Sequence, residues 1–393
     1  MEIQLTKTKT ITIGGGASGA RRTYTDVVGV ELFNGDPRGC PAVRLTKKKD
    51  GLRLVAAGFV PPPEKPLPGS WEEASKKCVW SLPSAFQAPC AALAVNSPDM
   101  FLAQTTKDAF LSDLAAGGHK SDEGSAPKSK FGIRRPAATP TQGGEGGSAA
   151  AAAEPGVPIS NGGMRFVMQP MKDSGGFVLE AGLPEFQALW LSRLLPEGKR
   201  PTAASIQLAP SALIASVLRQ PSLGQGSLVL FVACDAVYIV GYKGGDVVLW
   251  RKCRNAPGWT AMRETLKKNL GLEDNMVENV LDDKIIDPRS VLEPIVAPIA
   301  AELLVSRDYL VGKLGVETKT VLLSGLSAGF DCWKEIARDS ANLELKQIDT
   351  FDGIEASDKA LIGNGLSTKG AGAQAFLAAL GAAEALLEEE GEG

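Results

Sequence analysis

The sequence predicts an α/β protein with two lobes, each built around the same three-stranded antiparallel meander. In the later copy, residues 227–252, an unbroken apolar run at 228–233 precedes a bend, a second strand, a Lys-Gly-Gly-Asp hairpin and a third strand. An apolar run of this length favours a strand covered on both faces, and the hairpin has the residues that a tight turn needs. The earlier copy begins at 27–33 and repeats this order of strands and turns. A unit that occurs twice predicts two related domains that face each other.

The composition limits the class of protein. A chain of 393 residues is too long for one core and predicts two or three domains. A net charge of -3 gives no electrostatic argument for nucleic-acid binding. The apolar runs fall short of the roughly 20 residues of a membrane span, and the polar N-terminus is unlike a signal peptide. We therefore expect a cytosolic protein with no direct membrane span and no nucleic-acid partner.

Histidine and cysteine usage excludes several kinds of catalysis. His119 is the only histidine, so the sequence excludes Ser-His-Asp and Cys-His nucleophilic sites and metal sites with several histidines. The six cysteines are scattered without a Cys-x-x-Cys pair. They are expected to be reduced thiols, and a zinc cluster is not expected.

Between the meanders the pattern is interrupted once. Residues 1–25 are expected to be a flexible extension. Short strands are predicted at 91–96 and 100–104, and a helix from Lys107. Gly, Ser, Ala and Pro then dominate 115–163. Such a segment has too little apolar surface to offset the entropy of ordering it, which predicts a disordered loop.

Regular structure is expected again after this loop. A strand is predicted at 164–170, a helix at 183–195, a strand at 206–208 and a helix from Ser211, whose hydroxyl is a suitable N-cap. The helix at 183–195 has four apolar residues at helical spacing, which predicts that they face the core: Phe186, Leu189, Trp190 and Leu194.

The second half is predicted to be mostly helical. The first helix, at 259–270, ends before Gly271, a suitable C-cap. A longer helix is predicted at 290–314, with two prolines in its early turns, where missing N–H groups cost least. A strand at 321–323, a small-residue loop and a helix from Phe330 form a geometry that offers backbone N–H groups to a phosphate or sugar. An alanine-rich helix at 370–387 closes the chain.

The order of these features resembles the actin-like, or ribonuclease H-like, ATPase superfamily. Within it the chain resembles the PilM-type proteins of type IV pilus assembly, relatives of the cell-division protein FtsA. The resemblance runs from about Val27 to Leu387 and rests on the order and spacing of these stretches: 29–35 (GVELFNG), 164–195, the meander at 227–252, 292–304 (LEPIVAPIAAELL), and 321–330 (VLLSGLSAGF) with its closing 378–387.

The resemblance implies a fold of two lobes with an inserted subdomain in the first. The implied division is as follows: a first actin-like subdomain at 26–97 and 198–222, an inserted subdomain at 98–197 that contains the loop 115–163, a second actin-like subdomain at 226–252 and 318–393, and a helical subdomain at 253–317.

In this superfamily each meander bend is a phosphate loop. A carboxylate at the strand end handles magnesium or its water, and a glycine two residues later lets backbone N–H groups reach the phosphates. At the first bend Glu31 is the carboxylate that the pattern requires, but Phe33 occupies the position of the glycine. Asn34 and Gly35, which follow, are a partial substitute for that glycine.

The second bend departs further from the pattern. Val232 and Cys234 take the positions of the acid and the glycine, and Tyr238 stands where a small hydroxyl residue is usual. Asp235 is the only carboxylate nearby, and it is the one candidate for a catalytic acid. The third motif, a nucleoside loop, keeps three residues of its pattern: Gly325, Ser327 and Gly329.

These departures bear on catalysis because phosphoryl transfer depends on positioning and electrostatics. They favour a degenerate nucleotide site, in which bulky side chains such as Phe33 and Tyr238 partly fill the cleft. The alternative is a cleft that binds Mg-ATP weakly. The implied nucleotide-binding residues are Glu31, Asn34, Gly35, Asp235, Gly325, Ser327 and Gly329, with Glu31 also the magnesium candidate. Each also has a purely structural interpretation as a strand-end acid or a turn residue.

The function implied by the resemblance is a scaffold of the pilus assembly platform, cytoplasmic and held at the inner membrane by its partners. The implied partner is the cytoplasmic tail of a PilN-like single-span membrane protein, bound as a peptide in a groove of the first domain and its insertion, with further platform proteins as additional partners. Two alternatives stay open. One is an actin-like enzyme, an ATPase or a sugar kinase with Asp235 as its carboxylate; the other is a type II secretion platform subunit.

Overall fold

The computed structural model describes residues 24–64, 80–97, 99–107, 109, 159–161, 164–171, 177–195, 201–218, 220, 226–244, 246–273, 276–282, 286–316, 320–326, 328–363 and 366–388. The predicted extension before Tyr24 and most of the predicted loop 115–163 lie outside these residues. The end of that loop is a correction, because Ile159–Asn161 forms strand β6. Its residues pair with Met164, Arg165 and Phe166, and this cross-strand pairing orders a segment that composition alone predicts to be disordered.

The first lobe is built on the first meander. Strands β1 (Asp26–Leu32), β2 (Cys40–Lys48) and β3 (Gly51–Val60) pair in antiparallel fashion. Strands β4 (Cys90–Val95) and β9 (Thr202–Leu208) then extend the sheet parallel to β1. The order along this part of the sheet is β3-β2-β1-β4-β9, and the predicted meander is confirmed. A short 3-10 turn, Ser84–Phe86, precedes β4.

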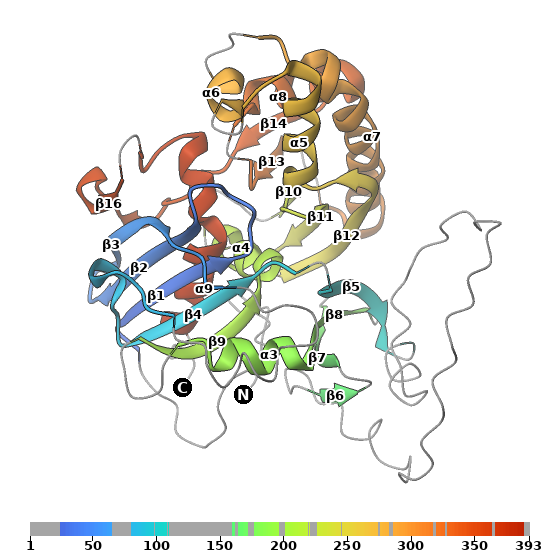
Figure 1. The fold of residues 1–393 in the computed structure, drawn as a ribbon. Helices are drawn as coiled ribbons and strands as arrows, with labels where there is room; N and C mark the ends of the chain where they lie inside the picture. The colour runs from blue at the N-terminus through green and yellow to red at the C-terminus, as the bar shows by residue number, and fades with distance from the viewer. Residues whose placement is uncertain are drawn as a thin grey trace, which may run out of the picture.

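The second lobe repeats this topology. Strands β10 (Gly226–Val232), β11 (Ala236–Lys243) and β12 (Asp246–Pro257) form the second meander. Strands β13 (Thr320–Ser324) and β14 (Glu344–Gln347) lie parallel to β10. The order β12-β11-β10-β13-β14 is the order of the first lobe, so the duplication inferred from the sequence extends to both sheets (Figure 1).

An inserted four-stranded sheet lies beside the lobes (Figure 1). It contains β6, β5 (Phe101–Thr106), β7 (Met164–Pro170) and β8 (Phe177–Pro184). Strand β5 also contacts the second lobe. There the Gln104 side-chain oxygen accepts a hydrogen bond from the backbone N–H of Trp250 at 2.9 Å. Helix α3 (Glu185–Ser192) follows β8 and packs against β7, β8 and β9.

Two details of this region differ from the prediction. Residues 183–184 belong to β8, so the helix is shorter than expected. Only part of the predicted core face is buried: Trp190 and Leu194 are, whereas Phe186 and Leu189 are 44% and 45% exposed. The physical reason is the position of α3, which packs on the first sheet and the inserted sheet with one side only. Phe186 and Leu189 lie on the opposite side.

Helices α4 (Ala209–Leu218) and α9 (Leu377–Glu388) pack against each other, and α9 also packs on β1. Helix α4 already begins at Ala209, so Ser211 lies inside its first turn and is not the predicted N-cap. A 3-10 segment, Ala371–Phe376, replaces the predicted first turns of the closing helix.

The C-terminal part corrects the domain division. The resemblance places residues 318–393 in the second lobe, but β15 (Ile354–Glu355) and β16 (Leu361–Ile362) pair with β3 of the first sheet. A 3-10 turn, Asp358–Ala360, lies between them. Helix α9 belongs with this sheet for a steric reason, because its small side chains let it approach β1 closely. The remaining boundaries stay a prediction.

The helices of the second lobe lie together (Figure 1). Helix α5 (Trp259–Leu270) ends at Gly271 in a left-handed conformation, as predicted. Helices α6 (Val277–Asp282), α7 (Arg289–Leu314) and α8 (Phe330–Ala341) follow. Among the described residues, no helix combines the length and apolar character required to cross a membrane.

Two apolar cores position the cleft between the lobes. Alternate residues of β10 divide between them, because successive side chains of a strand point to opposite faces. Val229 and Phe231 belong to the core that contains the first sheet, α4 and α9, while Leu228 and Leu230 face the core beneath α5, α7 and α8. The first core is therefore shared by both lobes.

Candidate functional site

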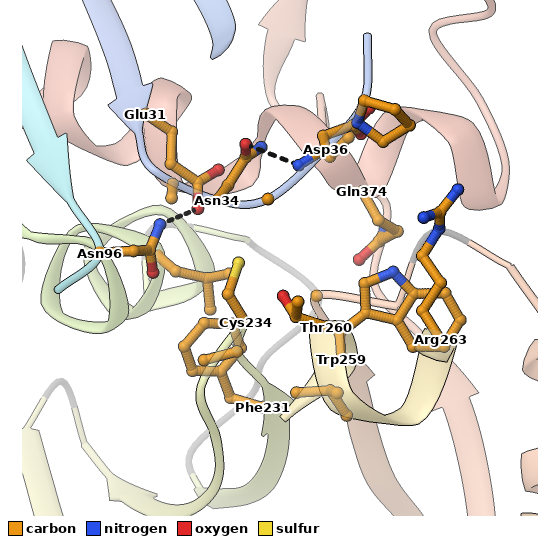
Figure 2. Close-up of a pocket in the computed structure, with 18 of the residues that line it drawn as sticks. Glu31, Asn34, Asp36, Asn96, Phe231, Cys234, Trp259, Thr260, Arg263 and Gln374 are labelled. Carbon is orange, nitrogen blue, oxygen red and sulfur yellow. Dashed lines mark hydrogen bonds between the residues drawn. The ribbon is translucent and has the colours of Figure 1, made fainter. Parts of the chain in front are cut away.

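The candidate site is the cleft where the two meander bends meet. It has a volume of about 90 Å³, below the roughly 300–1,000 Å³ of typical small-molecule pockets. Four of the predicted site residues line it, Glu31, Asn34, Gly35 and Gly325, whereas Asp235 and Gly329 do not. Ser327 lies outside the described residues. Figure 2 shows side chains from both lobes around this space.

Glu31 lies at the end of β1 with 9% of its surface exposed. Its carboxylate accepts a hydrogen bond from the Asn96 side-chain amide at 2.8 Å. Burial raises the pKa of Glu31 to about 7; the Asn96 hydrogen bond lowers this pKa, and the charge of Asp36 raises it. Burial therefore disfavours the charged form of the strand-end acid of the predicted phosphate loop.

Polar groups of the first bend are hydrogen-bonded to one another. The Asn34 side-chain oxygen accepts a hydrogen bond from the Asp36 N–H at 3.1 Å, and the Asp36 carboxylate accepts one from the Arg38 N–H at 2.9 Å. Gly35 takes a left-handed φ of 74°, and a Cβ there would lie 3.1 Å from the Thr260 hydroxyl of the other lobe. Two of the N–H groups of the bend are thus bonded within the bend, and are not directed at a phosphate.

Phe33 and Tyr238 do not fill the cleft, which corrects the expectation that they plug it. The Phe33 ring stacks on Trp190 of α3 with centroids 5.9 Å apart. Tyr238 is 2% exposed and packs between Phe231 and Trp250, with centroids 6.1 Å and 5.4 Å away. The cleft is narrowed instead by residues that line it, among them Phe231 and Trp259 (Figure 2).

The second bend is tied to the start of α5. The carbonyls of Ala233 and Cys234 accept hydrogen bonds from the N–H groups of Trp259 and Thr260, at 2.8 Å and 3.2 Å. A Cβ on Gly258 would lie 2.3 Å from the Cys234 carbonyl oxygen, so only glycine permits this contact. The first two N–H groups of α5, which could otherwise attract an anion, are therefore occupied by the bend.

The two side chains of this bend play different parts. The Cys234 thiol points into the space between the lobes (Figure 2), and its pKa is raised, first by burial and then by the charge of Glu31, so it is not an activated nucleophile. Asp235 is exposed at the surface and outside the cleft lining. The residue predicted as a catalytic carboxylate is therefore not placed in the cleft.

The glycines of the third motif have packing roles. A Cβ on Gly325 would lie 2.3 Å from the Val232 carbonyl oxygen, and its φ is 82°. Gly329 is the N-cap of α8 with a φ of 74°. Both positions require glycine for backbone reasons, whether or not a nucleoside binds.

The sequence prediction missed several polar residues of the cleft, among them Asn96, Arg263 and Gln374. Gln374 donates from its side-chain nitrogen to the Ile348 carbonyl and the Thr350 hydroxyl, while its side-chain oxygen, in the cleft wall, has no hydrogen-bond partner among the described residues. Only Asn96 had a local signal: it follows β4, the parallel neighbour of β1, and the ends of such strands meet at one edge.

The described residues do not fit a magnesium-bound polyphosphate. Among them, no three His, Cys, Asp or Glu side chains are grouped to hold a metal ion. The backbone N–H groups of Asp36 and Arg38 in the first bend, and of Trp259 and Thr260 at the start of α5, are bonded to protein atoms. Asp36 and Glu264 add negative charge to the lining. We therefore derive no phosphoryl-transfer step through this cleft.

No protein-family model matches the chain, and no curated protein sequence matches it. A solved structure of a PilM-PilN type IV pilus biogenesis complex overlaps it with a TM-score of 0.58 and 14% identity, over 94% of this chain and 100% of that one. The chain has the actin-like, PilM-type fold.

Other solved structures overlap more loosely. A protein of Bacteroides thetaiotaomicron with an actin-like ATPase fold and unknown function gives a TM-score of 0.38 at 10% identity, over 85% of this chain and 94% of that one. The cytoplasmic domain of EpsL, from the type II secretion system of Vibrio cholerae, gives 0.28 at 9% identity, over 58% and 71%. At these scores nothing further is inferred from them, and the PilM-type fold rests on the first overlap and the duplicated sheet order.

Proposed function

We propose that this protein is a scaffold of a type IV pilus assembly machine, held at the cytoplasmic face of the inner membrane by the tail of a PilN-like membrane protein. The observation that carries this proposal is the overlap with the PilM-PilN complex along nearly the whole chain. The cleft supports a non-catalytic role, because several backbone donors beside it are bonded to protein atoms and Asp235 lies outside its lining.

Helix α3 is the proposed docking surface for that tail. It packs against β9 of the first sheet and β7 and β8 of the inserted sheet, where the first domain meets its insertion. Phe186 and Leu189 expose 44% and 45% of their surface on this helix, while Trp190 and Leu191 on its other side are buried. An extended or helical peptide uses apolar anchors of this kind and needs no phosphate loop.

We expect a synthetic peptide of the PilN-like tail to bind the purified protein with micromolar affinity in calorimetric titration. Replacing both Phe186 and Leu189 with aspartate is expected to weaken binding by about tenfold or more, because truncating central apolar anchors has the largest effect on an interface. Val305→Asp on α7, where Val305 is 58% exposed, is the matched control and should bind like the wild type. Equal affinities for all three proteins would contradict docking on α3.

Mg-ATP is expected to give no turnover above background in the same preparation. The physical reason is that backbone N–H groups beside both bends are bonded to protein atoms and do not bind the β- and γ-phosphates. The measurement is phosphate release with saturating Mg-ATP, with and without the peptide. Rapid release that Asp235→Ala abolishes would overturn the scaffold proposal in favour of an actin-like enzyme.

A further inference from the structure

Helix α3 is joined to the cleft through an aromatic contact. Phe33, two residues after Glu31, has a φ of 60°, a left-handed backbone conformation that is uncommon and strained for a bulky residue. Its ring stacks on Trp190, which is 1% exposed and fixed in the core. The strained bend and α3 therefore hold each other in place.

A chain of hydrogen bonds forms a second connection between the same two sites. Asn96 donates to Glu31 in the cleft. The adjacent Ser97 hydroxyl donates to the Gln187 side-chain oxygen on α3 at 2.9 Å, and the Gln187 amide donates to Asp99 at 3.1 Å. Asn96, Ser97 and Gln187 are each at most 6% exposed, and a buried polar group that loses its partner destabilises the fold.

The two faces of α3 carry different contacts. Gln187 and Trp190 are three residues apart and face the cleft side, while Phe186 and Leu189 are exposed. Both faces belong to one short helix of 8 residues. A shift of α3 would stretch the Phe33–Trp190 stack and the Ser97–Gln187 hydrogen bond together.

We propose that α3 is a coupling element: a partner that docks on its exposed face changes the conformation of the first bend, 31–40, through Phe33 and Ser97, and a change in the bend alters partner affinity in return. Reciprocity follows from thermodynamic linkage between the two sites. The identity of the partner rests on the proposed function, whereas the link between α3 and the bend does not.

The first experiment tests the link without a partner. Hydrogen–deuterium exchange is measured by mass spectrometry for wild type, Trp190→Leu, Trp190→Phe and Trp333→Leu. Trp190→Leu is expected to speed exchange of amides in 31–40 by about tenfold, because the stack that holds the bend is lost. Trp190→Phe keeps an aromatic ring and should restore protection.

Trp333 is equally buried but belongs to the other core, so Trp333→Leu controls for general destabilisation. Unchanged exchange in 31–40 for Trp190→Leu, or an equal change for Trp333→Leu, overturns the link.

The second experiment adds the synthetic PilN-like tail. Its binding is expected to change exchange in 31–40 of the wild type, and Phe33→Gly is expected to alter its Kd by about fivefold although Phe33 is not on the proposed docking face. Ser97→Ala tests the hydrogen-bonded connection in the same way. Binding that leaves the bend unchanged and is insensitive to both variants overturns the coupling but not the scaffold. No binding to any protein overturns the scaffold, and the partner-free experiment still decides the link.

Discussion

Gly29→Ala is expected to destabilise the protein by more than about 3 kcal/mol, which is exceptional for the addition of one methyl group. Gly29 lies in the middle of β1, and a Cβ there would lie 1.8 Å from the Ala379 carbonyl oxygen of α9. Because the obstacle is helix backbone, no side chain can turn away to make room, and α9 must leave the sheet. Urea unfolding followed by circular dichroism measures the loss.

Gly381→Ala is the companion variant and Gly312→Ala is the control. A Cβ on Gly381 would lie 1.8 Å from the Ala212 carbonyl oxygen of α4, so a loss of similar size is expected. Gly312 lies in α7, and a Cβ there would meet no described atom within 4 Å beyond the backbone of its own helix. Alanine at this position should therefore stabilise the helix by up to about 1 kcal/mol. A Gly29→Ala protein as stable as Gly312→Ala would show that α9 does not pack closely on β1.

Glu31→Gln is expected to remove a pH dependence of stability. The pKa of Glu31 is raised by burial from 4.5 to about 7. Between these values the unfolded chain releases a proton that the folded protein keeps, so the free energy of unfolding falls as pH rises. The loss is complete only above pH 7 and amounts to about 2–3 kcal/mol between pH 5 and pH 8. Glutamine carries no proton to release, so the variant should lack this fall.

The measurement is urea unfolding of wild type and Glu31→Gln at pH 5 and pH 8. Glu335→Gln, an exposed acid on α8, is the control and should retain the pH dependence of the wild type. If Glu31→Gln shows the same fall in stability between the two pH values as the wild type, Glu31 does not keep its proton in the folded protein.

The site is only partly predictable from the sequence. Glu31, Asn34, Gly35 and Gly325 are candidates through their positions in the two bends and the third loop, and the structure brings them together. Asp235 is a candidate only by its nearness in sequence, and the bend turns it to the surface. Gln374 has no local signal at all, because it reaches the cleft from a segment far away in sequence.

Both meanders, the long helix α7 and the C-cap of α5 can be predicted from the sequence, because they depend on apolar periodicity and turn residues within a few positions of each other. Three features could not be predicted in this way: the pairing of β15 and β16 with the first sheet, the stacking of Phe33 on Trp190, and the half exposure of Phe186. These features depend on how close two backbones can approach and on which neighbour covers a face. Both are long-range packing properties, which a local pattern does not encode.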